Sequence, residues 1–427
     1  MTSSFAPQRA VLDNGLTVVH QHNPVSPAVI ASLSIAAGAV LEPVEHGGLA
    51  TLTAAALRRG TKSRSKRDIG EILDYHGAHL GCSASRHGTS LVAKMRAVDA
   101  AEVIGLMGDC ARNPVFPSAE LEKLRGNRLT ALREDRDDPD IMAARGFREI
   151  LYPAGHPYAT AVRGTVESVE SIQVEQLRSF HTAHYAPSAA LLIIVGAVDW
   201  EETVALAHQH FGTWQGSDRG GYRGAQEEIP DAPIGVAVER RLEMPDKAQV
   251  SLLMGHSGIR RADPRFYAAA LMNSVLGRFA MGGRLGRVVR EEQGMAYYTY
   301  SDFSAGVGAG PFTVRAGVQP QHLAAAVAAI REQVETVRAT GVQVAELNDA
   351  RAAAIGSLPR ALESNEGIAG MLHQVELFDL GWDYPARYAE IMASVDLDAV
   401  NAAARQLLHP DALCLSAAGP LQPTSAP

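Results

Sequence analysis

Arg290 and Tyr297 lie seven residues apart and together have the chemistry needed to hold a peptide carbonyl. Arginine offers a fixed fork of N–H donors, and tyrosine offers a directional O–H donor. Donors of this kind can bind the carbonyl oxygen of a substrate and stabilise the negative charge that develops on it during hydrolysis. The alternative is that Arg290 forms a surface ion pair and Tyr297 packs in a core, because short motifs also match by chance.

The segment that carries this pair is predicted to be a helix followed by a strand. Apolar residues recur with helical spacing across 285–289, and Gly294 is placed to let the chain leave the helix. A run rich in β-favouring residues follows at 297–303. We therefore expect Arg290 near a helix C-terminus and Tyr297 near the start of a strand, so that one turn brings both side chains to the same surface.

Length and composition exclude several classes of protein. A chain of 427 residues is expected to form two domains rather than one core. Its 46% hydrophobic and 20% charged residues are typical of a globular protein, and its net charge of -8 argues against nucleic acid or an anionic membrane as the main partner. The three cysteines, Cys82, Cys110 and Cys414, are too few and odd in number for a disulfide framework. No signal peptide or long apolar span is evident, so we predict a cytoplasmic protein.

The order of predicted elements occurs twice along the chain. Near the N-terminus, Asp13-Asn14-Gly15 separates two apolar runs and predicts a β-hairpin. The stretch Pro187–Gly196 resembles Pro410–Gly419, with proline and glycine nine residues apart in both. The segment 215–230 is polar and glycine-rich, which is typical of a linker. We predict two similar α+β domains, 1–218 and 230–427.

The run from Leu276 to Tyr297 resembles the C-terminal half of the pitrilysin and insulinase family of zinc peptidases, the inverzincins. The shared features are Gly282-Gly283, Arg284-Leu285 and the Arg-x6-Tyr ending. The resemblance extends over nearly the whole chain and is to the short, two-domain type, similar to mitochondrial-processing-peptidase subunits. It implies two mainly antiparallel sheets with helices packed on them, joined by a linker into half a clamshell, with strand 297–303 lining the cleft. It also implies that Arg290 and Tyr297 reach the substrate over the zinc, and that Gly282 and Gly283 leave room for an extended peptide.

The zinc motif of this family is missing from the N-terminal half. Active members resemble Gly-Leu-Ala-His-x-x-Glu-His followed by Gly-Thr, in which the two histidines and the glutamate share one helix face. Here Gly48-Leu49-Ala50 and Gly60-Thr61 set the register, so the three positions are Thr51, Ala54 and Ala55. Zinc requires histidine, cysteine or carboxylate ligands, and these residues supply none.

The position of the third zinc ligand also lacks a histidine, cysteine or carboxylate side chain. Asp137-Asp138-Pro139 sets its register and places it near Ala131, beside Thr130. We find no replacement set along these helices. We therefore expect this chain to bind no metal itself.

Other polar clusters have simpler explanations than a metal or catalytic site. Glu42–His46 contains Pro43, which argues against the helix that an inverted zinc motif needs. His76-x-x-His79-x-x-Cys82 is expected on a loop that enters an edge strand, and His181-x-x-His184 at a helix end. The basic cluster from Arg58 to Arg67 is expected to be a solvated loop, although it could guide acidic peptides.

These observations predict a zinc-less subunit of a heterodimeric zinc metalloendopeptidase, inactive alone. In this interpretation a homologous subunit bearing His-x-x-Glu-His supplies the zinc and the general base, and this chain contributes Arg290 and Tyr297. The substrates would be peptides or unfolded polypeptides. The alternative is a non-catalytic scaffold or peptide-binding member of the same family within a larger assembly. A free-standing peptidase with an unrelated site has no support in the sequence.

Overall fold

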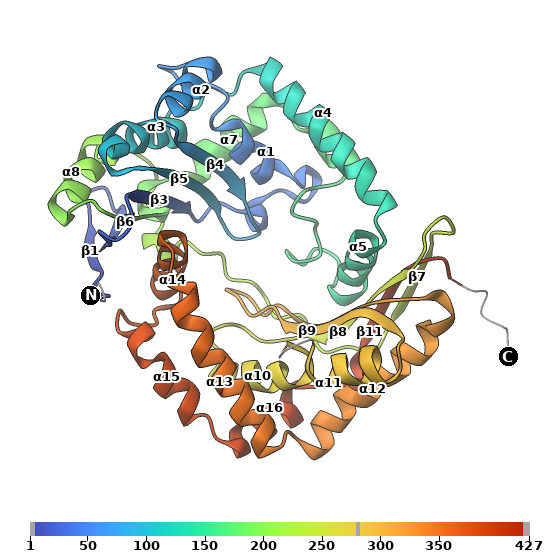
Figure 1. The fold of residues 1–427 in the computed structure, drawn as a ribbon. Helices are drawn as coiled ribbons and strands as arrows, with labels where there is room; N and C mark the ends of the chain where they lie inside the picture. The colour runs from blue at the N-terminus through green and yellow to red at the C-terminus, as the bar shows by residue number, and fades with distance from the viewer. Residues whose placement is uncertain (1–4, 279–281, 422–427) are drawn as a thin grey trace. The chain divides into compact units, whose positions relative to one another are not determined.

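The computed structural model describes residues 5–278 and 282–421, which form two compact units (Figure 1). Neither unit is continuous in sequence. Unit 1 contains the chain up to Leu132, Thr160–Glu227 and Pro359–Tyr384, and unit 2 contains Arg133–Ala159, Glu228–Leu358 and the chain from Pro385 onward. Each unit is built on one mainly antiparallel sheet with helices packed on it, as the sequence predicts.

The sheet of unit 1 has six strands in the order β1-β2-β6-β3-β5-β4. These strands are β1 (Gln8–Val11), β2 (Thr17–His22), β3 (Ala28–Ile35), β4 (His79–Ala84), β5 (Thr89–Arg96) and β6 (Ala190–Gly196). Strands β2 and β6 are parallel, and the other neighbouring pairs are antiparallel. The predicted hairpin is confirmed: β1 pairs with β2, and Gly15 in the turn has a φ of +87°.

The sheet of unit 2 has five strands in the order β7-β11-β8-β10-β9. Its strands are β7 (Glu239–Glu243), β8 (Val250–Ser257), β9 (Ala296–Phe303), β10 (Pro311–Val318) and β11 (Cys414–Gly419). Only β7 and β11 are parallel. This arrangement repeats β2-β6-β3-β5-β4 of unit 1, and β1 has no counterpart among the strands that the structure describes.

The repeated Pro-to-Gly stretches have the same conformation in both units. A short 3-10 turn precedes β6 at Pro187–Ala189 and precedes β11 at Pro410–Ala412. Gly196 and Gly419 end these strands with the same φ of +147°, where a side chain would clash with the backbone of the neighbouring strand. The two stretches therefore close equivalent sheets.

Helices cover one face of each sheet with residues from the same half of the chain. In unit 1 they are α1 (Leu49–Ala56), α2 (Lys66–Tyr75), α3 (Ala100–Arg112), α6 (Val166–Ser171), α7 (Val174–His184) and α8 (Trp200–Phe211). The short α9 (Gly221–Gly224) lies on the other face, where Tyr222 joins the core of Leu191 and Ile193. In unit 2 they are α10 (Phe266–Asn273), α11 (Gly283–Leu285), α12 (Leu323–Thr340), α15 (Tyr384–Ser394) and α16 (Leu397–Leu407). Helices α4 (Ser118–Glu134) and α13 (Val344–Ala361) each contain a point at which the chain passes from one unit to the other.

The opposite face of each sheet is covered by a helix from the other half of the chain. Helix α14 (Asn365–Phe378) packs on β3 and β6, where Leu372 joins the core of Leu191 and Ile193. Helix α5 (Pro139–Leu151) packs on β7, β8 and β11, where Phe147 contacts the core beside Leu253. Figure 1 shows this exchange in its colours, with orange α14 against blue β3 and green β6, and teal α5 against yellow and red strands.

The domain ranges 1–218 and 230–427 remain a prediction, and these units differ from them in two respects. The predicted ranges assign α5 and α14 to the half of the chain in which each lies, because a helical pattern does not reveal which sheet the helix covers. The first part of the expected linker at 215–230 is held in place by hydrogen bonds. Arg219 donates to the carbonyls of Ala36, His184 and Ala225. The buried Tyr222 bonds to His373 of α14. Within this segment the chain changes from unit 1 to unit 2 after Glu227.

We predict that fragments 1–227 and 228–427 do not fold separately but recover native structure when they are mixed. Each fragment lacks the helix that buries the second face of its own sheet, and each carries the helix that the other needs. Circular dichroism and chemical denaturation of each fragment and of the mixture test this expectation. A cooperative unfolding transition of either fragment alone would contradict it.

Candidate functional site

The turn that carries Arg290 leads directly into strand β9. A π-helical segment, Gly286–Glu292, contains Arg290, and Gly294 leaves it with a φ of +62°. The amide of Met295 then donates to the carbonyl of Val289 at 3.0 Å, which draws the start of β9 back towards the end of the helix. The predicted helix-to-strand turn is confirmed, with Arg290 partly buried on its last helical turn.

Tyr297 is the extra residue of a β-bulge at the start of β9. Along this strand Ala296 pairs with Val318 of β10, and Tyr298 pairs with Gly317, so Tyr297 has no partner in the register. Ala296 and Thr299 both point into the protein, although strict alternation would place them on opposite faces. The bulge directs the Tyr297 side chain outward, and it is 69% exposed.

Tyr298, the residue after the bulge, is fixed by contacts with β10 and α5. Its ring lies where a side chain at Gly317 would lie, and its phenol donates to the Asp140 carboxylate of α5 at 2.5 Å. Burial and the Asp140 carboxylate both raise the pKa of the Tyr298 phenol, so it stays a donor at neutral pH. The exchanged helix therefore fixes the strand from which Tyr297 projects.

A pocket of about 310 Å³ lies beside Tyr297. It is lined by Ala248, Gln249, Tyr297, Gln319, Pro320 and Gln321. These residues come from the chain before β8, the start of β9 and the chain after β10, which meet at one end of the sheet. The three glutamines could not be predicted from the sequence, because only strand pairing brings them to Tyr297. None of these six described residues is charged, so they can offer amide and phenol hydrogen bonds to a peptide.

Gly282 and Gly283 lie against the backbone of their own unit. A side chain at Gly282 would come within 2.5 Å of the Thr299 carbonyl oxygen of β9, and one at Gly283 within 2.4 Å of the Val275 carbonyl oxygen. Both glycines also have positive φ angles, +112° and +58°. Their requirement for glycine is therefore explained by local packing, and their role in substrate binding remains a prediction. Residues 279–281 of the same motif lie outside the described residues.

The positions of the zinc motif do not fit a metal ion. Thr51 and Ala54 are buried in α1, and the Thr51 hydroxyl donates to the Gly48 carbonyl at 2.9 Å. Ala131 lies on α4 and has no donor atom in its side chain. Within residues 5–278 and 282–421, no group of three or more His, Cys, Asp or Glu side chains could hold a metal ion.

Glu42 caps the helix on which the zinc motif would lie. Its carboxylate accepts hydrogen bonds from the amides of Gly48 at 3.0 Å and Ala50 at 2.6 Å. Burial raises the pKa of Glu42 to about 7, because desolvation outweighs these two bonds and the charge of Arg86. Pro43 lies between two 3-10 turns, Ala39–Leu41 and Val44–His46, so Glu42–His46 is not the helix that an inverted zinc motif needs.

The histidine clusters have structural partners. His76 bonds to Asp99 at 2.8 Å and to Glu102 at 2.9 Å, while His79 and Cys82 lie on edge strand β4. Burial raises the pKa of the Cys82 thiol to about 12, so it is not an activated nucleophile. His181, near the end of α7, bonds to the carbonyl of Ala111.

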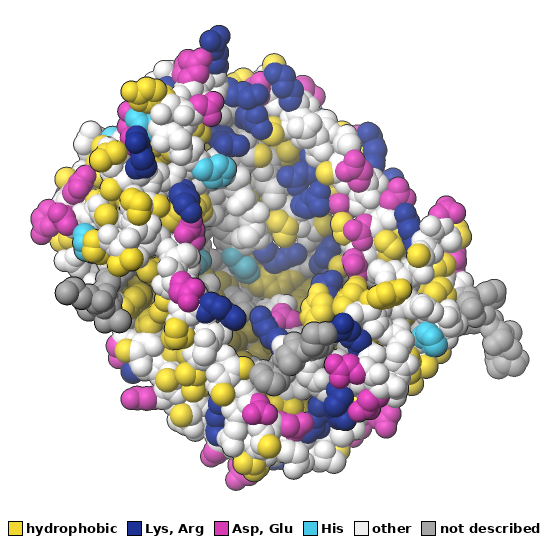
Figure 2. Space-filling model, viewed as in Figure 1, with side chains coloured by type: hydrophobic (Ala, Val, Ile, Leu, Met, Phe, Trp, Pro, Cys, Tyr) yellow, Lys and Arg dark blue, Asp and Glu magenta, His cyan; other side chains and the backbone are white. Residues whose placement is uncertain are grey.

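The basic cluster after α1 forms ion pairs within unit 1. Arg64 pairs with Asp109 at 2.9 Å, Lys66 pairs with Glu120 at 3.1 Å, and Arg67 pairs with Glu71. On the face of the molecule that Figure 2 shows, acidic and basic side chains are interspersed. The cluster therefore has local partners rather than forming an isolated basic patch.

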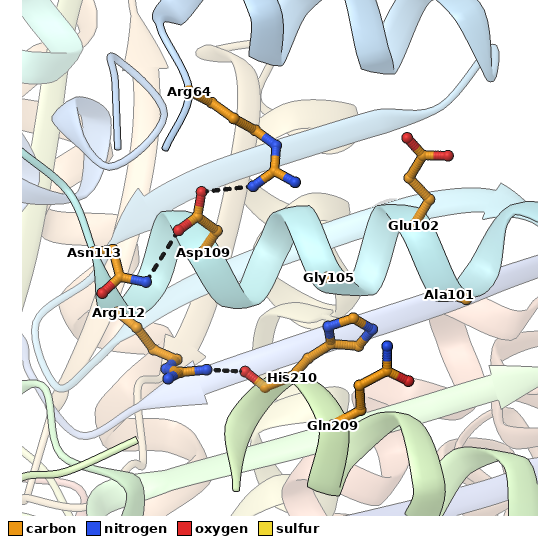
Figure 3. A pocket seen from close by; sticks show the side chains of 9 residues that line it. All are labelled: Arg64, Ala101, Glu102, Gly105, Asp109, Arg112, Asn113, Gln209 and His210. Carbon is orange, nitrogen blue, oxygen red and sulfur yellow. Dashed lines mark hydrogen bonds and ion pairs between the residues drawn. The ribbon is translucent and has the colours of Figure 1, made fainter. Parts of the chain in front are cut away.

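A second pocket, of about 470 Å³, lies beside α3 in unit 1 (Figure 3). Burial alone would raise the pKa of Asp109, but hydrogen bonds from its neighbours hold it below its usual value. These neighbours are Thr61, Ser63, Asn113 and Arg64. Arg112 donates to the carbonyl of His210 and to Thr213. These groups tie loops to α3, and we assign them no catalytic chemistry.

Comparisons with known proteins give the family. Residues 17–145 match the model of insulinase (peptidase family M16), and residues 171–354 match the model of the peptidase M16 inactive domain. The chain belongs to the M16 peptidase family, and the resemblance seen in the sequence is confirmed.

Relatives of this chain cover most of its length. An uncharacterized zinc protease of Mycobacterium leprae is 27% identical over 94% of this chain and 89% of its own. A probable mitochondrial-processing peptidase subunit beta of Schizosaccharomyces pombe is 25% identical over 67% of this chain and 64% of its own. The crystal structure of a peptidase M16 inactive domain from Pseudomonas fluorescens superposes with a TM-score of 0.90 at 25% identity, covering 98% of this chain and all of that one. Among the described residues, no helix is long and apolar enough to cross a membrane.

We predict that Glu42→Gln changes the pH dependence of stability. The folded protein holds the Glu42 proton more tightly than the unfolded chain does, so the contribution of Glu42 to the free energy of unfolding falls as pH rises from about 4.5 to about 7. Glutamine keeps an acceptor oxygen but cannot ionise, so the stability of the variant should rise relative to wild type by roughly 1–3 kcal/mol across this window. Urea denaturation at several pH values measures the difference.

The matched control for this measurement is Glu45→Gln, an exposed carboxylate on the next turn. It should retain the wild-type pH dependence. A constant difference between Glu42→Gln and wild type at every pH would show that Glu42 has an ordinary pKa.

We predict that the purified chain alone binds no stoichiometric zinc and cleaves no peptide. The reason is that Thr51, Ala55 and Ala131 stand at the three ligand positions of the family motif, and Ala54 stands at the position of its general base. Elemental analysis after dialysis tests this expectation. About one zinc ion per chain that resists dialysis would contradict it.

Proposed function

We propose that this chain is the zinc-less subunit of a heterodimeric M16 metalloendopeptidase. The observation that carries the proposal is Tyr297, which a β-bulge directs outward beside an amide-lined pocket at the end of the turn that bears Arg290. Relatives over most of the chain are named zinc proteases, yet this chain has no ligands at the zinc positions. A half-site that lacks metal and keeps carbonyl-binding donors supports a role beside another subunit's zinc.

In this proposal, the two side chains act on the carbonyl of the scissile peptide bond. The Tyr297 phenol donates one hydrogen bond to the carbonyl oxygen, and the Arg290 guanidinium stabilises the negative charge that develops there. A zinc ion bound by a homologous subunit with a His-x-x-Glu-His motif would supply the activated water. The substrates would be peptides or unfolded polypeptides, because the site must admit an extended chain.

A non-catalytic scaffold or peptide-binding protein is the second candidate. The absence of ligand side chains at the zinc-motif positions of α1 and α4 supports this candidate, because a scaffold needs no metal. The two candidates differ in what they require of Tyr297. A scaffold does not need its hydroxyl group for turnover.

We predict that Tyr297→Phe lowers turnover of the reconstituted complex by about 100-fold to 1000-fold, the usual cost of one lost oxyanion donor, roughly 2.7–4 kcal/mol. Arg290→Ala should lower turnover to a similar extent or weaken substrate binding. Steady-state kinetics with a peptide substrate measures both effects, and size-exclusion chromatography checks that assembly is unchanged.

Matched controls are available on the same two elements. Tyr300→Phe removes the hydroxyl of another exposed tyrosine of β9, and Arg287→Ala removes an exposed arginine that pairs with Glu292. Both should retain wild-type turnover, since an exposed ion pair is worth only about 0–1 kcal/mol. If Tyr297→Phe and Arg290→Ala assemble and cleave as well as these controls, the scaffold is the better account.

A further inference from the structure

Among the described strands, β7 has one unpaired edge at the end of the unit 2 sheet, whereas the equivalent strand of unit 1, β2, is paired on both sides. Strands β2 and β7 are equivalent, since each is the parallel neighbour of the strand that ends its half. In unit 1 the outer side of β2 pairs with β1. In the part of the chain that the structure describes, β7 pairs only with β11, and all five of its residues are exposed. Such an edge presents unpaired N–H and C=O groups to another strand.

Apolar side chains lie along this open edge. Arg240 points to the face covered by α5, because its guanidinium pairs with Glu149 of that helix at 2.6 Å. Alternation along the strand places Val238 and Leu242 on the same face, where they are 46% and 36% exposed. Val236, two residues before Val238, is 87% exposed. A partner strand beside β7 would bury this apolar row.

The sequence of β7 is complementary to itself in one antiparallel register. A two-fold axis perpendicular to the sheet at Arg240 places Glu239 opposite Arg241 of the second copy, and Val238 opposite Leu242 of the second copy. Opposite charges directly across a sheet are favourable, and like charges are unfavourable. The two Arg240 side chains face each other at the axis, but each already pairs with its own Glu149.

The neighbouring registers are less favourable. Moving the axis to Arg241 places Glu239 opposite Glu243, and moving it to Glu239 places that residue opposite its own copy. Both registers put carboxylates against each other. The charge pattern therefore selects the register centred on Arg240.

We infer that β7 is a self-association surface, at which two copies of this chain pair their β7 strands antiparallel about Arg240 and join their sheets into one. The occupant is a second copy of the same chain, because both the apolar pair and the charge pair are satisfied by the β7 sequence itself. This surface is separate from the pocket at Tyr297, which lies at β9 on the opposite edge of the sheet.

Sedimentation velocity of the full chain over a range of concentrations tests this inference. Wild type should show a reversible monomer–dimer equilibrium, and Val238→Lys or Leu242→Lys should raise the dissociation constant at least tenfold. Val98→Lys introduces the same side chain at another exposed valine, in unit 1, and should leave the dimer unchanged. Unchanged melting temperatures would show that the variant monomers are folded. A wild-type chain that stays monomeric, or a dimer that both lysine variants leave intact, overturns the inference.

A charge-exchange experiment tests the register. Glu239→Arg and Arg241→Glu should each weaken the dimer at least tenfold, because each places like charges across the axis. Mixing the two variants should restore association, because the mixed dimer regains two opposite-charge pairs. The pair of Arg241 and Glu239 within one chain, at 3.1 Å, is lost in each variant and is not regained by mixing. A mixture that associates no better than either variant would contradict pairing through β7.

Discussion

The burial of both faces of the two sheets is the constraint on which this structure depends. Every residue of β6, β8 and β11 is buried, so the central strands need a helical layer on each side. Alternate residues of β6 enter two different cores: Leu192 and Ile194 pack with the helices of their own half, and Leu191 and Ile193 pack with α14. Because α5 covers the other sheet in the same way, each half of the chain completes the core of the other.

The exchange of helices between the two halves also affects the candidate site. Helix α5 presents Asp140 to Tyr298, and the Tyr298 ring occupies the space above Gly317 of β10. The bulge at Tyr297 is thus held by a contact with α5 on one side and by the turn after Arg290 on the other. The outward direction of the Tyr297 side chain follows from packing around its neighbours rather than from contacts of its own ring.

Local patterns in the sequence predicted most of the helices and strands. The hairpin at Gly15, the helix-to-strand turn at Gly294 and the Pro-to-Gly repeat depend on neighbouring residues, so their patterns are visible in the sequence. The exchange of α5 and α14 is not visible, because an amphipathic helix carries no signal for which sheet it covers. The hydrogen bonds of Arg219 and Tyr222 within the expected linker are not visible either, because they are made with distant groups, and the bulge at Tyr297 exists only in the register between two strands.

We propose that this chain completes a peptidase site whose zinc belongs to a homologous subunit. The most direct measurement is zinc-dependent cleavage of an unfolded polypeptide by each chain alone and by the mixture, with a His-x-x-Glu-His chain encoded in the same genome as the second component. The account predicts that only the mixture cleaves, and that chelation abolishes cleavage. A zinc-bearing chain that cleaves equally fast without this protein, or a mixture that forms a stable complex with no activity, would contradict it.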